Sequence, residues 1–430
     1  MTEEFMKFNN HWSSQKFSKN MLQDALVKHV LGLVNYRMAD VGEVLEVNAN
    51  LKNGDEQNWI GAWATMANRL QERAVQYEQA NKLVSAGSAY LRASTYWRVA
   101  LMYFGDVADP RIRQYCRLSQ SCYDKSMKLS GYPGKAVEIP YENTTLPGHY
   151  FQSPHANGKS PLLIVVPGRD TWADDTRWVT DAAIKRGINA LTFDGPGQGM
   201  TLRLQGLPFR PDFENVMKPV LDFAEGLSDV DSSRIGVMGM SFGGFQVPRA
   251  AAFDKRIKIC IADPGNIAWG KMIGQRLNKI LALPKRLRPA MLEYMLKDYT
   301  WKHGCSEKEL LPELAKYDNS DIINQIQSKV LVLNGAAEIN PEAAKEFYNQ
   351  LTCPKDYLFF DEDSTAQQHT QMGGYAPASE MISTGLKTTY RWGVLNETLH
   401  FWCNRTDRRR TGSPVFRKEI FSYCLCSSSR

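Results

Sequence analysis

The sequence predicts an α/β protein in which a mostly parallel, doubly wound sheet follows an all-helical N-terminal region. Two observations predict this class. From about residue 20 to 130, apolar residues recur at three- and four-residue spacing, which is typical of amphipathic helices. After that region, short runs rich in Val, Ile and Leu alternate with helical segments, and such runs are typical of parallel strands covered by helices on both faces.

Residues 1–134 are predicted to form a helical domain of about four to six helices. The helical spacing is clearest in MLQDALVKHVLGLV, in WIGAWATMANRLQERAVQYEQA and in ASTYWRVALMYFGD. The pattern changes at the turn-forming run GYPG, residues 131–134, so we place a domain boundary there.

Residues 135–385 are predicted to hold the sheet. Two strands should flank the polar turn at residues 142–144. Four helices are predicted: near 175–186, near 212–226, directly after Ser241, and in PEAAKEFYNQL. The later strands are predicted in PLLIVV (161–166), NALTF (189–193), RIGVM (234–238), IKICIA (257–262), KVLVLN (329–334) and YLFF (357–360). A helical, basic insertion at about 266–325 interrupts the alternation. Residues 386–430 show neither helical period nor caps, so we expect an irregular basic tail.

The net charge of +6 does not indicate a nucleic-acid-binding protein. Residues 401–430 hold seven basic and two acidic residues, so this segment supplies nearly all of the net charge. A basic groove built into the fold is therefore not expected. No run approaches the roughly 18 apolar residues that span a bilayer. Because MTEEFMKFNNHW also lacks the basic start and apolar core of a signal peptide, we expect a cytoplasmic protein with no membrane partner.

Neither the cysteines nor the glycine-rich motifs predict a cofactor. The eight cysteines are scattered, without the paired spacing of zinc or haem sites. FDGPGQGM, residues 193–200, lacks the G-x-G-x-x-G spacing and follows an interior strand, so a tight strand-to-helix loop is favoured over a dinucleotide site. We therefore predict no cofactor and no bound metal.

Ser241 is the candidate nucleophile. It lies in GVMGMSFGGFQV, residues 236–247, where G-x-S-x-G follows a short apolar strand and precedes an Ala-rich helical stretch. A nucleophile elbow needs this order, because a tight strand-to-helix turn lifts the serine hydroxyl out of the backbone. Gly239 and Gly243 stand where a side chain would collide with the turn. The alternative is a structural serine in a glycine-rich turn.

Groups that follow other strands can join Ser241, because the carboxyl ends of parallel strands meet at one edge of the sheet. His369 is the candidate general base, since it alone of the seven histidines follows a sheet strand at the proper place. Glu338 follows the strand KVLVLN and completes the chain order serine, acid, histidine. We favour Glu338 as the acid. Asp263, at the end of IKICIA, is the alternative because it could reach the same histidine from the neighbouring loop.

Acyl transfer also requires donors for the oxyanion. One candidate is the backbone N–H of Phe242, directly after the nucleophile, and the other should come from the loop after PLLIVVPG. In that loop, Arg169 is the first candidate for the second donor and Asp170 is the next. The alternative for these two residues is a surface turn with a local ion pair.

Several of these segments together resemble a group of α/β hydrolases. They are PGRDTWADD (167–175), FDGPGQG (193–199), GMSFGG (239–244), NGAAEINP (334–341) and the late His369. The group contains the bacterial 2,6-dihydroxypseudooxynicotine hydrolases and fungal hydrolases of polyketide pathways, including naphthopyrone chain-shortening, fusarin and cytochalasin enzymes. The resemblance covers about residues 20–385. Two positions differ from the usual pattern: Glu338 stands where aspartate is usual, and Thr370 stands where cysteine is frequent.

The resemblance implies a helical cap over a serine triad and a small-molecule, polyketide-like ketone or ester substrate of secondary-metabolite biosynthesis. Ser241 would attack a carbonyl, His369 would protonate the leaving group, and a C–C, ester or thioester bond would break. Two alternatives fit the same residues: a cyclase or acyltransferase with this triad, and a non-catalytic binding protein on a hydrolase scaffold. An exposed apolar face on the N-terminal helices would allow a homodimer.

Overall fold

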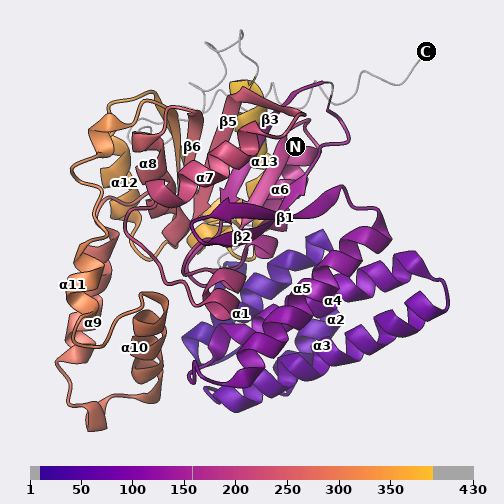
Figure 1. The fold of residues 1–430 in the computed structure, drawn as a ribbon. Coiled ribbons are helices and arrows are strands. Elements are labelled where there is room, and N and C mark those ends of the chain that lie inside the picture. Colours follow the sequence, from indigo (N-terminus) through magenta and orange to yellow (C-terminus); the bar gives the residue numbers. More distant parts are fainter. Residues whose placement is uncertain (1–9, 157, 391–430) are drawn as a thin grey trace, which may run out of the picture. The chain divides into compact units, whose positions relative to one another are not determined.

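An eight-stranded sheet organises residues 10–156 and 158–390, the part of the chain that the computed structural model describes (Figure 1). Its strand order is β1-β2-β4-β3-β5-β6-β7-β8. β1 pairs antiparallel with β2, and β2 with β4, whereas all other neighbours are parallel. The strands are β1 (Gly134–Tyr141), β2 (Thr144–Phe151), β3 (Ser160–Val166), β4 (Asn189–Phe193), β5 (Val230–Met240), β6 (Ile257–Asp263), β7 (Lys329–Gly335) and β8 (Lys355–Phe360). The predicted α/β class with a mostly parallel sheet is confirmed.

Helices alternate with the parallel strands as the sequence predicts. They are α6 (Arg177–Ile184), α7 (Glu214–Glu225), α8 (Phe242–Phe253) and α12 (Pro341–Gln350). Pro248 lies inside α8. The loop of FDGPGQGM leads into a short π-helical segment, Thr201–Gln205.

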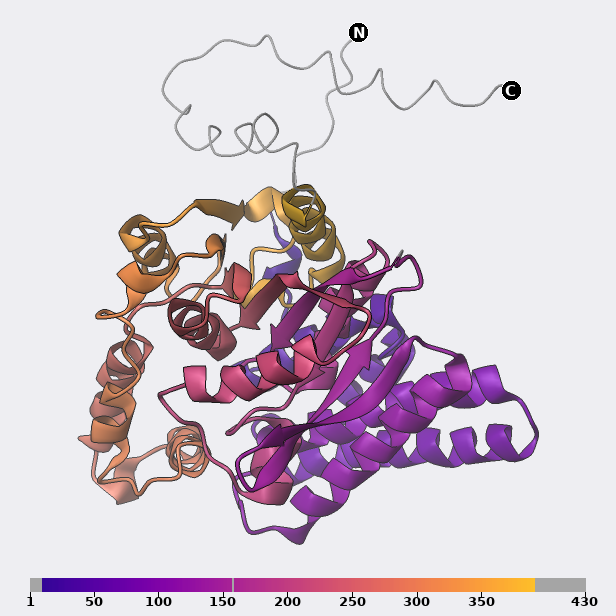
Figure 2. The same ribbon diagram turned by 45° about the horizontal axis from the view of Figure 1, so that its top comes forward.

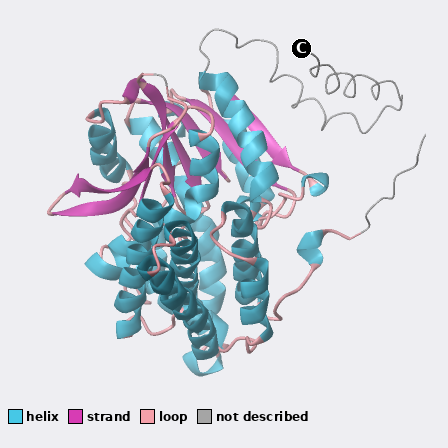
Figure 3. Ribbon diagram, turned by 90° about the vertical axis from the view of Figure 1, so that its right-hand side faces the viewer, coloured by secondary structure: helices cyan, strands magenta, loops and turns pink. Residues whose placement is uncertain are grey.

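From residue 10 onwards, five α-helices precede the sheet, and four of them begin at a side-chain cap. They are α1 (Met21–Gly32), α2 (Val41–Ala49), α3 (Glu56–Gln79), α4 (Leu83–Ala100) and α5 (Pro110–Ser130). Asn20, Asp40, Asp55 and Asp109 each accept backbone N–H groups of the first turn, which satisfies donors that have no partner within the helix. In Figure 3 these helices fill the lower part of the picture, and the strands lie above them.

The two faces of the sheet belong to different hydrophobic cores. Along β3, Leu163 and Val165 face the core shared with α1 to α5, whereas Leu162, Ile164 and Val166 face the core shared with α7 and α8. This alternation follows from the two-residue period of a strand. Because the N-terminal helices and the sheet share one core, the division of the chain into domains at residues 134 and 385 stays a prediction.

A helical insertion follows β6, and a further helix follows the last strand. The insertion contains α9 (Trp269–Leu281), α10 (Ala290–Lys302) and α11 (Leu310–Ala315), coloured salmon to orange in Figure 2. The last helix, α13 (Tyr375–Tyr390), continues past residue 385, where the sequence predicts that regular structure ends. Extending an existing helix by a few residues is easy even without a cap signal. The rest of the predicted tail, 391–430, lies outside the described residues.

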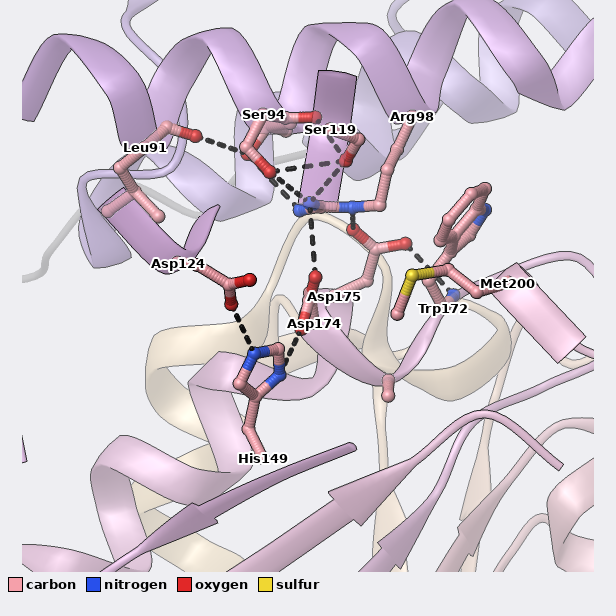
Figure 4. A network of polar contacts seen from close by, with 12 residues as sticks. Leu91, Ser94, Arg98, Ser119, Asp124, His149, Trp172, Asp174, Asp175 and Met200 are labelled. Carbon is pink, nitrogen blue, oxygen red and sulfur yellow. Dashed lines mark hydrogen bonds and ion pairs between the residues drawn. The ribbon is translucent and has the colours of Figure 1, made fainter. Parts of the chain in front are cut away.

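Arg98 of α4 is the centre of a buried ion-pair network between the N-terminal helices and the sheet (Figure 4). Its Nε donates to Asp175 Oδ1 at 2.9 Å, and its Nη1 lies 3.6 Å from Asp174 Oδ2. Asp174 Oδ1 lies 2.9 Å from His149 Nδ1 on β2, and His149 Nε2 lies 3.0 Å from Asp124 Oδ1 on α5. The network therefore joins α4, α5, β2 and the loop after β3.

The charges of this network stabilise one another despite their burial. Burial lowers the pKa of His149, but Asp174 and Asp124 outweigh it and raise that pKa to about 9. Burial raises the pKa of Asp174, but His149 and Arg98 outweigh it, so the net shift is downward. Asp175 also accepts the backbone N–H of Trp172 at 3.1 Å. The N-terminal helices thus fix the loop that follows β3.

Removing the Arg98 cation should destabilise the protein strongly. Arg98→Met keeps most of the side-chain volume but leaves Asp175 without its cation and Asp174 with His149 alone. Breaking a buried pair in this way typically costs about 3–5 kcal/mol. The control is Arg69→Met, since Arg69 pairs with Glu46 at the surface and we expect little change there. Thermal melting of both variants checks the prediction, and equal melting temperatures would contradict it.

Candidate active site

Ser241 lies at the junction of β5 and α8, in the strand-turn-helix setting that its sequence predicts. Its backbone has φ 55° and ψ −116°, a conformation that residues other than glycine rarely adopt. Such strain costs on the order of 1–3 kcal/mol and persists only where the surrounding structure enforces it. The turn places Ser241 at the carboxyl edge of the sheet, where the loops after β3, β7 and β8 begin.

Close backbone packing explains the two glycines that flank Ser241. A Cβ atom on Gly239 would lie 2.0 Å from the carbonyl oxygen of Gly243, and one on Gly243 would lie 2.7 Å from that of Val166. Real Cβ atoms do not approach a carbonyl oxygen so closely. The turn can therefore form only if both positions lack side chains.

Backbone contacts between two loops bring Glu338 beside His369. The loop after β7 and the loop after β8 form an isolated parallel bridge between Ala337 and Gln368, and Ala337 N–H donates to Gln367 O at 2.9 Å. Glu338 and His369 are the next residues on the two loops. The bridge therefore sets their side chains next to each other.

Ser241, His369 and Glu338 form one hydrogen-bonded chain. His369 Nε2 lies 2.8 Å from Ser241 Oγ, and His369 Nδ1 lies 2.7 and 2.8 Å from the two carboxylate oxygens of Glu338. Burial lowers the pKa of His369, but Glu338 outweighs this and the net shift is upward. Burial raises the pKa of Glu338, but His369 outweighs it and the net shift is downward. The carboxylate is thus held ionised against the imidazole.

Asp263, the alternative acid, lies nearby without a hydrogen bond to His369. It ends β6 in register with Met240 of β5, and its Oδ1 accepts from Gln371 Nε2 at 2.9 Å. Its Oδ2 is buried without a partner, and burial raises its pKa to about 7. Of the two candidate acids, the structure brings Glu338 to the histidine.

The predicted oxyanion donors lie in two places, at the first residue of α8 and in the loop that contains Arg169 and Asp170. Phe242 is the first residue of α8, so its backbone N–H has no acceptor within the helix. The side chain of Arg169 donates from Nη1 to Asp170 at 2.8 Å and from Nη2 to Asp298 of α10. Lys302 also pairs with Asp170 and, at 2.9 Å, with Asp298. Ion pairs thus occupy Nη1 and Nη2 of Arg169, whereas its Nε is buried without a hydrogen-bond partner. The backbone N–H groups of residues 169–170 are the other candidate donors for the oxyanion.

A cavity of about 160 Å³ lies beside Ser241 and His369. A cavity of this size accommodates roughly one benzene ring. Its polar lining includes His29 of α1 and Tyr375 of α13, and its apolar walls are formed by Leu22, Leu26, Met102, Trp178, Met240 and Met372. A larger hollow of about 840 Å³, between α10 and the Thr201–Gln205 segment, contains none of the predicted site residues.

Sequence reasoning missed the polar residues that line this cavity besides the predicted site residues and Asp175 of the Arg98 network, which are His29, Thr171, Thr370 and Tyr375. His29 and Tyr375 are 346 positions apart, and no local pattern links them. In the part of the chain that the structure describes, no group of three or more His, Cys, Asp or Glu side chains could hold a metal ion. The described residues also contain no helix of the length and apolar character needed to cross a bilayer.

Residues 42–318 match the protein family described as esterase FrsA-like. The alpha/beta hydrolase psoB of Aspergillus fumigatus is 33% identical over 419 residues, which cover 88% of this chain and 93% of psoB. The 20-hydroxy-prefusarin hydrolase FUS2 of Gibberella moniliformis is 36% identical over 246 residues, which cover 55% of this chain and 58% of FUS2. The alpha/beta hydrolase xenA of Xenoacremonium sinensis is 34% identical, and the match covers 59% of this chain and 62% of xenA. The chain thus spans less than two thirds of FUS2 and of xenA, but nearly all of psoB.

The crystal structure of the 2,6-dihydroxy-pseudo-oxynicotine hydrolase has the same fold. Its TM-score is 0.67 at 20% identity, and the match covers 83% of this chain and 94% of that chain. The predicted likeness to this enzyme and to fungal α/β hydrolases is confirmed. The chain belongs to the FrsA-like esterase family of α/β hydrolases.

Alanine at Gly239 should disrupt the turn that holds Ser241. The new Cβ would overlap the carbonyl oxygen of Gly243, and we expect a loss of at least about 1–3 kcal/mol of unfolding free energy. Gly274→Ala in α9 is the control, because its Cβ would meet only Leu311 at 3.8 Å and alanine favours a helix by about 1 kcal/mol. Urea unfolding of both variants measures the two effects, and a Gly239→Ala protein as stable as wild type would show that the turn tolerates a side chain.

Proposed function

We propose that this FrsA-like protein is a serine hydrolase that cleaves a bond next to a carbonyl group, with Ser241 as nucleophile, His369 as general base and acid, and Glu338 as the supporting carboxylate. The observation that carries the proposal is the continuous hydrogen-bonded chain from Glu338 through His369 to Ser241. An ordinary turn serine would need neither the backbone strain nor the buried carboxylate behind the histidine.

Each step of the proposed reaction uses one of these contacts. His369 Nε2 removes the Ser241 proton as Oγ attacks the carbonyl carbon, and Glu338 stabilises the resulting imidazolium. The Phe242 N–H and the backbone of residues 169–170 then bind the oxyanion. His369 returns the proton to the leaving group, and water hydrolyses the acyl-enzyme with His369 as base. The leaving group is an alcohol, a thiol or a carbon acid according to whether an ester, a thioester or a C–C bond is cleaved.

The relatives support a small molecule of fungal secondary metabolism as the substrate. FUS2 is named for the hydrolysis of 20-hydroxy-prefusarin, and psoB and xenA are named as alpha/beta hydrolases. The cavity beside Ser241 supports a substrate whose reacting end is compact and mostly apolar. The bond itself, whether C–C, ester or thioester, follows from the leaving group that the substrate offers.

Hydrolysis in water labelled with ¹⁸O tests the proposed reaction. With p-nitrophenyl butyrate as probe, we expect one ¹⁸O atom in the released butyrate and no turnover by Ser241→Ala. A butyryl group found on an acceptor other than water, without the label, would indicate acyl transfer instead. Absence of turnover by folded wild-type protein, for a panel of p-nitrophenyl esters and thioesters, would favour a binding protein on a hydrolase scaffold.

Neutralising Glu338 should slow the reaction far more than neutralising Asp263. Glu338→Gln keeps the side-chain size but cannot stabilise the imidazolium, and the corresponding change in a known triad lowers kcat by about 10⁴-fold. Asp263→Asn is the matched control, because Asp263 bonds Gln371 rather than His369, and we expect less than about tenfold loss. Steady-state kinetics with the same ester compare the two variants. A larger loss in Asp263→Asn would assign the acid to β6 instead.

The acidic limb of the pH profile should report His369. Only the neutral imidazole can accept the Ser241 proton, so activity falls as pH drops below the pKa of His369. Glu338 raises this pKa above its ordinary value of 6.5, and in Glu338→Gln burial should instead lower it. We therefore expect the midpoint of the acidic limb of kcat/KM to lie above pH 6.5 in the wild type and at a lower pH in Glu338→Gln. A limb that stays in place or moves to higher pH would contradict the assignment.

A further inference from the structure

His29 lines the cavity beside Ser241 and has one ring nitrogen without a hydrogen-bond partner. It lies on α1 of the N-terminal helices, and its residue is only 5% exposed. Its Nδ1 lies 2.7 Å from the hydroxyl of Tyr375, whereas its Nε2 is buried and has no hydrogen-bond partner. Both residues line the cavity that also contains Ser241 and His369.

The surroundings of His29 keep it neutral. Burial lowers its pKa, and this outweighs the opposing charge of Asp175, while Arg98 lowers the pKa further. Burial also raises the pKa of Tyr375, so its phenol keeps the proton. Neither group therefore carries charge near neutral pH.

The contact with Tyr375 determines which ring nitrogen carries hydrogen. An unprotonated imidazole nitrogen is a stronger acceptor than a phenol oxygen, so the Tyr375 hydroxyl donates to Nδ1. A neutral imidazole that accepts at one nitrogen carries its hydrogen on the other. The unpaired Nε2 is thus an N–H donor, and a buried donor without an acceptor is unfavourable unless a ligand supplies one.

The rest of the cavity wall specifies the group that would supply this acceptor. Met102, Trp178 and Met240 provide apolar contact, and the volume of about 160 Å³ suits a group close to one ring in size. Trp178 stacks on Tyr375 with ring centroids 4.9 Å apart, which fixes the ring that holds His29. A hydrocarbon group would fill this space but leave the His29 N–H unpaired.

We propose that His29 determines specificity by donating a hydrogen bond from Nε2 to a second oxygen atom of the substrate, besides the carbonyl that Ser241 attacks. The pocket then selects an oxygenated, ring-sized acyl group over a hydrocarbon group of the same shape. This inference rests on the proposed hydrolase function, because it assigns the cavity to the acyl group of the substrate. It gives the N-terminal helices a direct role in substrate selection.

Three matched esters test the proposal: p-nitrophenyl cyclohexanecarboxylate as the hydrocarbon ester, and its 3-oxo and 4-oxo derivatives as the oxygenated esters. The readout is the ratio of kcat/KM for the better oxo ester to kcat/KM for the hydrocarbon ester. His29→Leu should lower this ratio at least about tenfold, since a site built to bond an oxygen discriminates strongly only while its donor is present. His29→Gln, which retains an N–H donor, should recover part of the ratio.

Tyr36→Phe is the matched control. Tyr36 also joins the N-terminal helices to α13, through hydrogen bonds to Tyr375 O and Ser379 Oγ, but it does not line the cavity. Its variant should keep the wild-type ratio even if its melting temperature falls. A drop in the ratio for Tyr36→Phe as large as for His29→Leu would show a structural effect and overturn the proposal.

The remaining outcomes separate this proposal from the proposed function. An unchanged ratio in folded His29→Leu overturns the role of His29 and leaves the hydrolase function intact. If wild type hydrolyses none of the esters although a fluorophosphonate labels Ser241, the selection proposal also fails, because the site does not accept the oxygenated, ring-sized acyl group that it is proposed to select. If Ser241 is not labelled either, the hydrolase function fails and this proposal fails with it.

Discussion

The arrangement of the site depends on one constraint, the convergence of strand ends at a single edge of the parallel sheet. Ser241 directly follows β5, and the loops after β7 and β8 carry Glu338 and His369, although 128 positions separate Ser241 from His369. The bridge between Ala337 and Gln368 turns this convergence into contact, because it sets the acid and the histidine side by side. A change in strand order would separate these groups even if every residue were retained.

The N-terminal helices cover one face of the sheet, and they also form buried ion pairs with the loop after β3. Arg98 reaches the loop after β3 through Asp175, whose other carboxylate oxygen holds the backbone of Trp172. The insertion binds the same loop from another direction, through Asp298 of α10 and Arg169. The segment expected to bind the oxyanion is thus held by buried charges from two separate helical elements. Such support limits the movement of the backbone donors, which electrostatic stabilisation of a transition state requires.

The sheet and the residues of the hydrogen-bonded chain were predictable because their signals are local. Strand runs such as PLLIVV are continuous and apolar, and the glycines around Ser241 mark a turn that admits no side chain. The choice of Glu338 over Asp263 could be argued only from position, and the loop bridge that places Glu338 beside His369 has no sequence signature. The roles of His29 and Arg98 could not be predicted for the same reason, since their partners lie far away in the chain. In the sequence, a buried polar residue on a helix cannot be told from an exposed one. Helix α13 was not predicted, and it continues past residue 385 because the propagation of a helix needs no local signal.

If Ser241 is the nucleophile, its hydroxyl must be activated by His369, and labelling by a fluorophosphonate measures this activation without knowledge of the substrate. Intact-mass analysis should find one adduct on the wild-type chain, none on Ser241→Ala, and much slower labelling of Glu338→Gln. Each protein should first be shown to be folded by its melting temperature. Failure of folded wild-type protein to form an adduct, or an adduct that persists in Ser241→Ala, would contradict the assignment of Ser241 as the nucleophile.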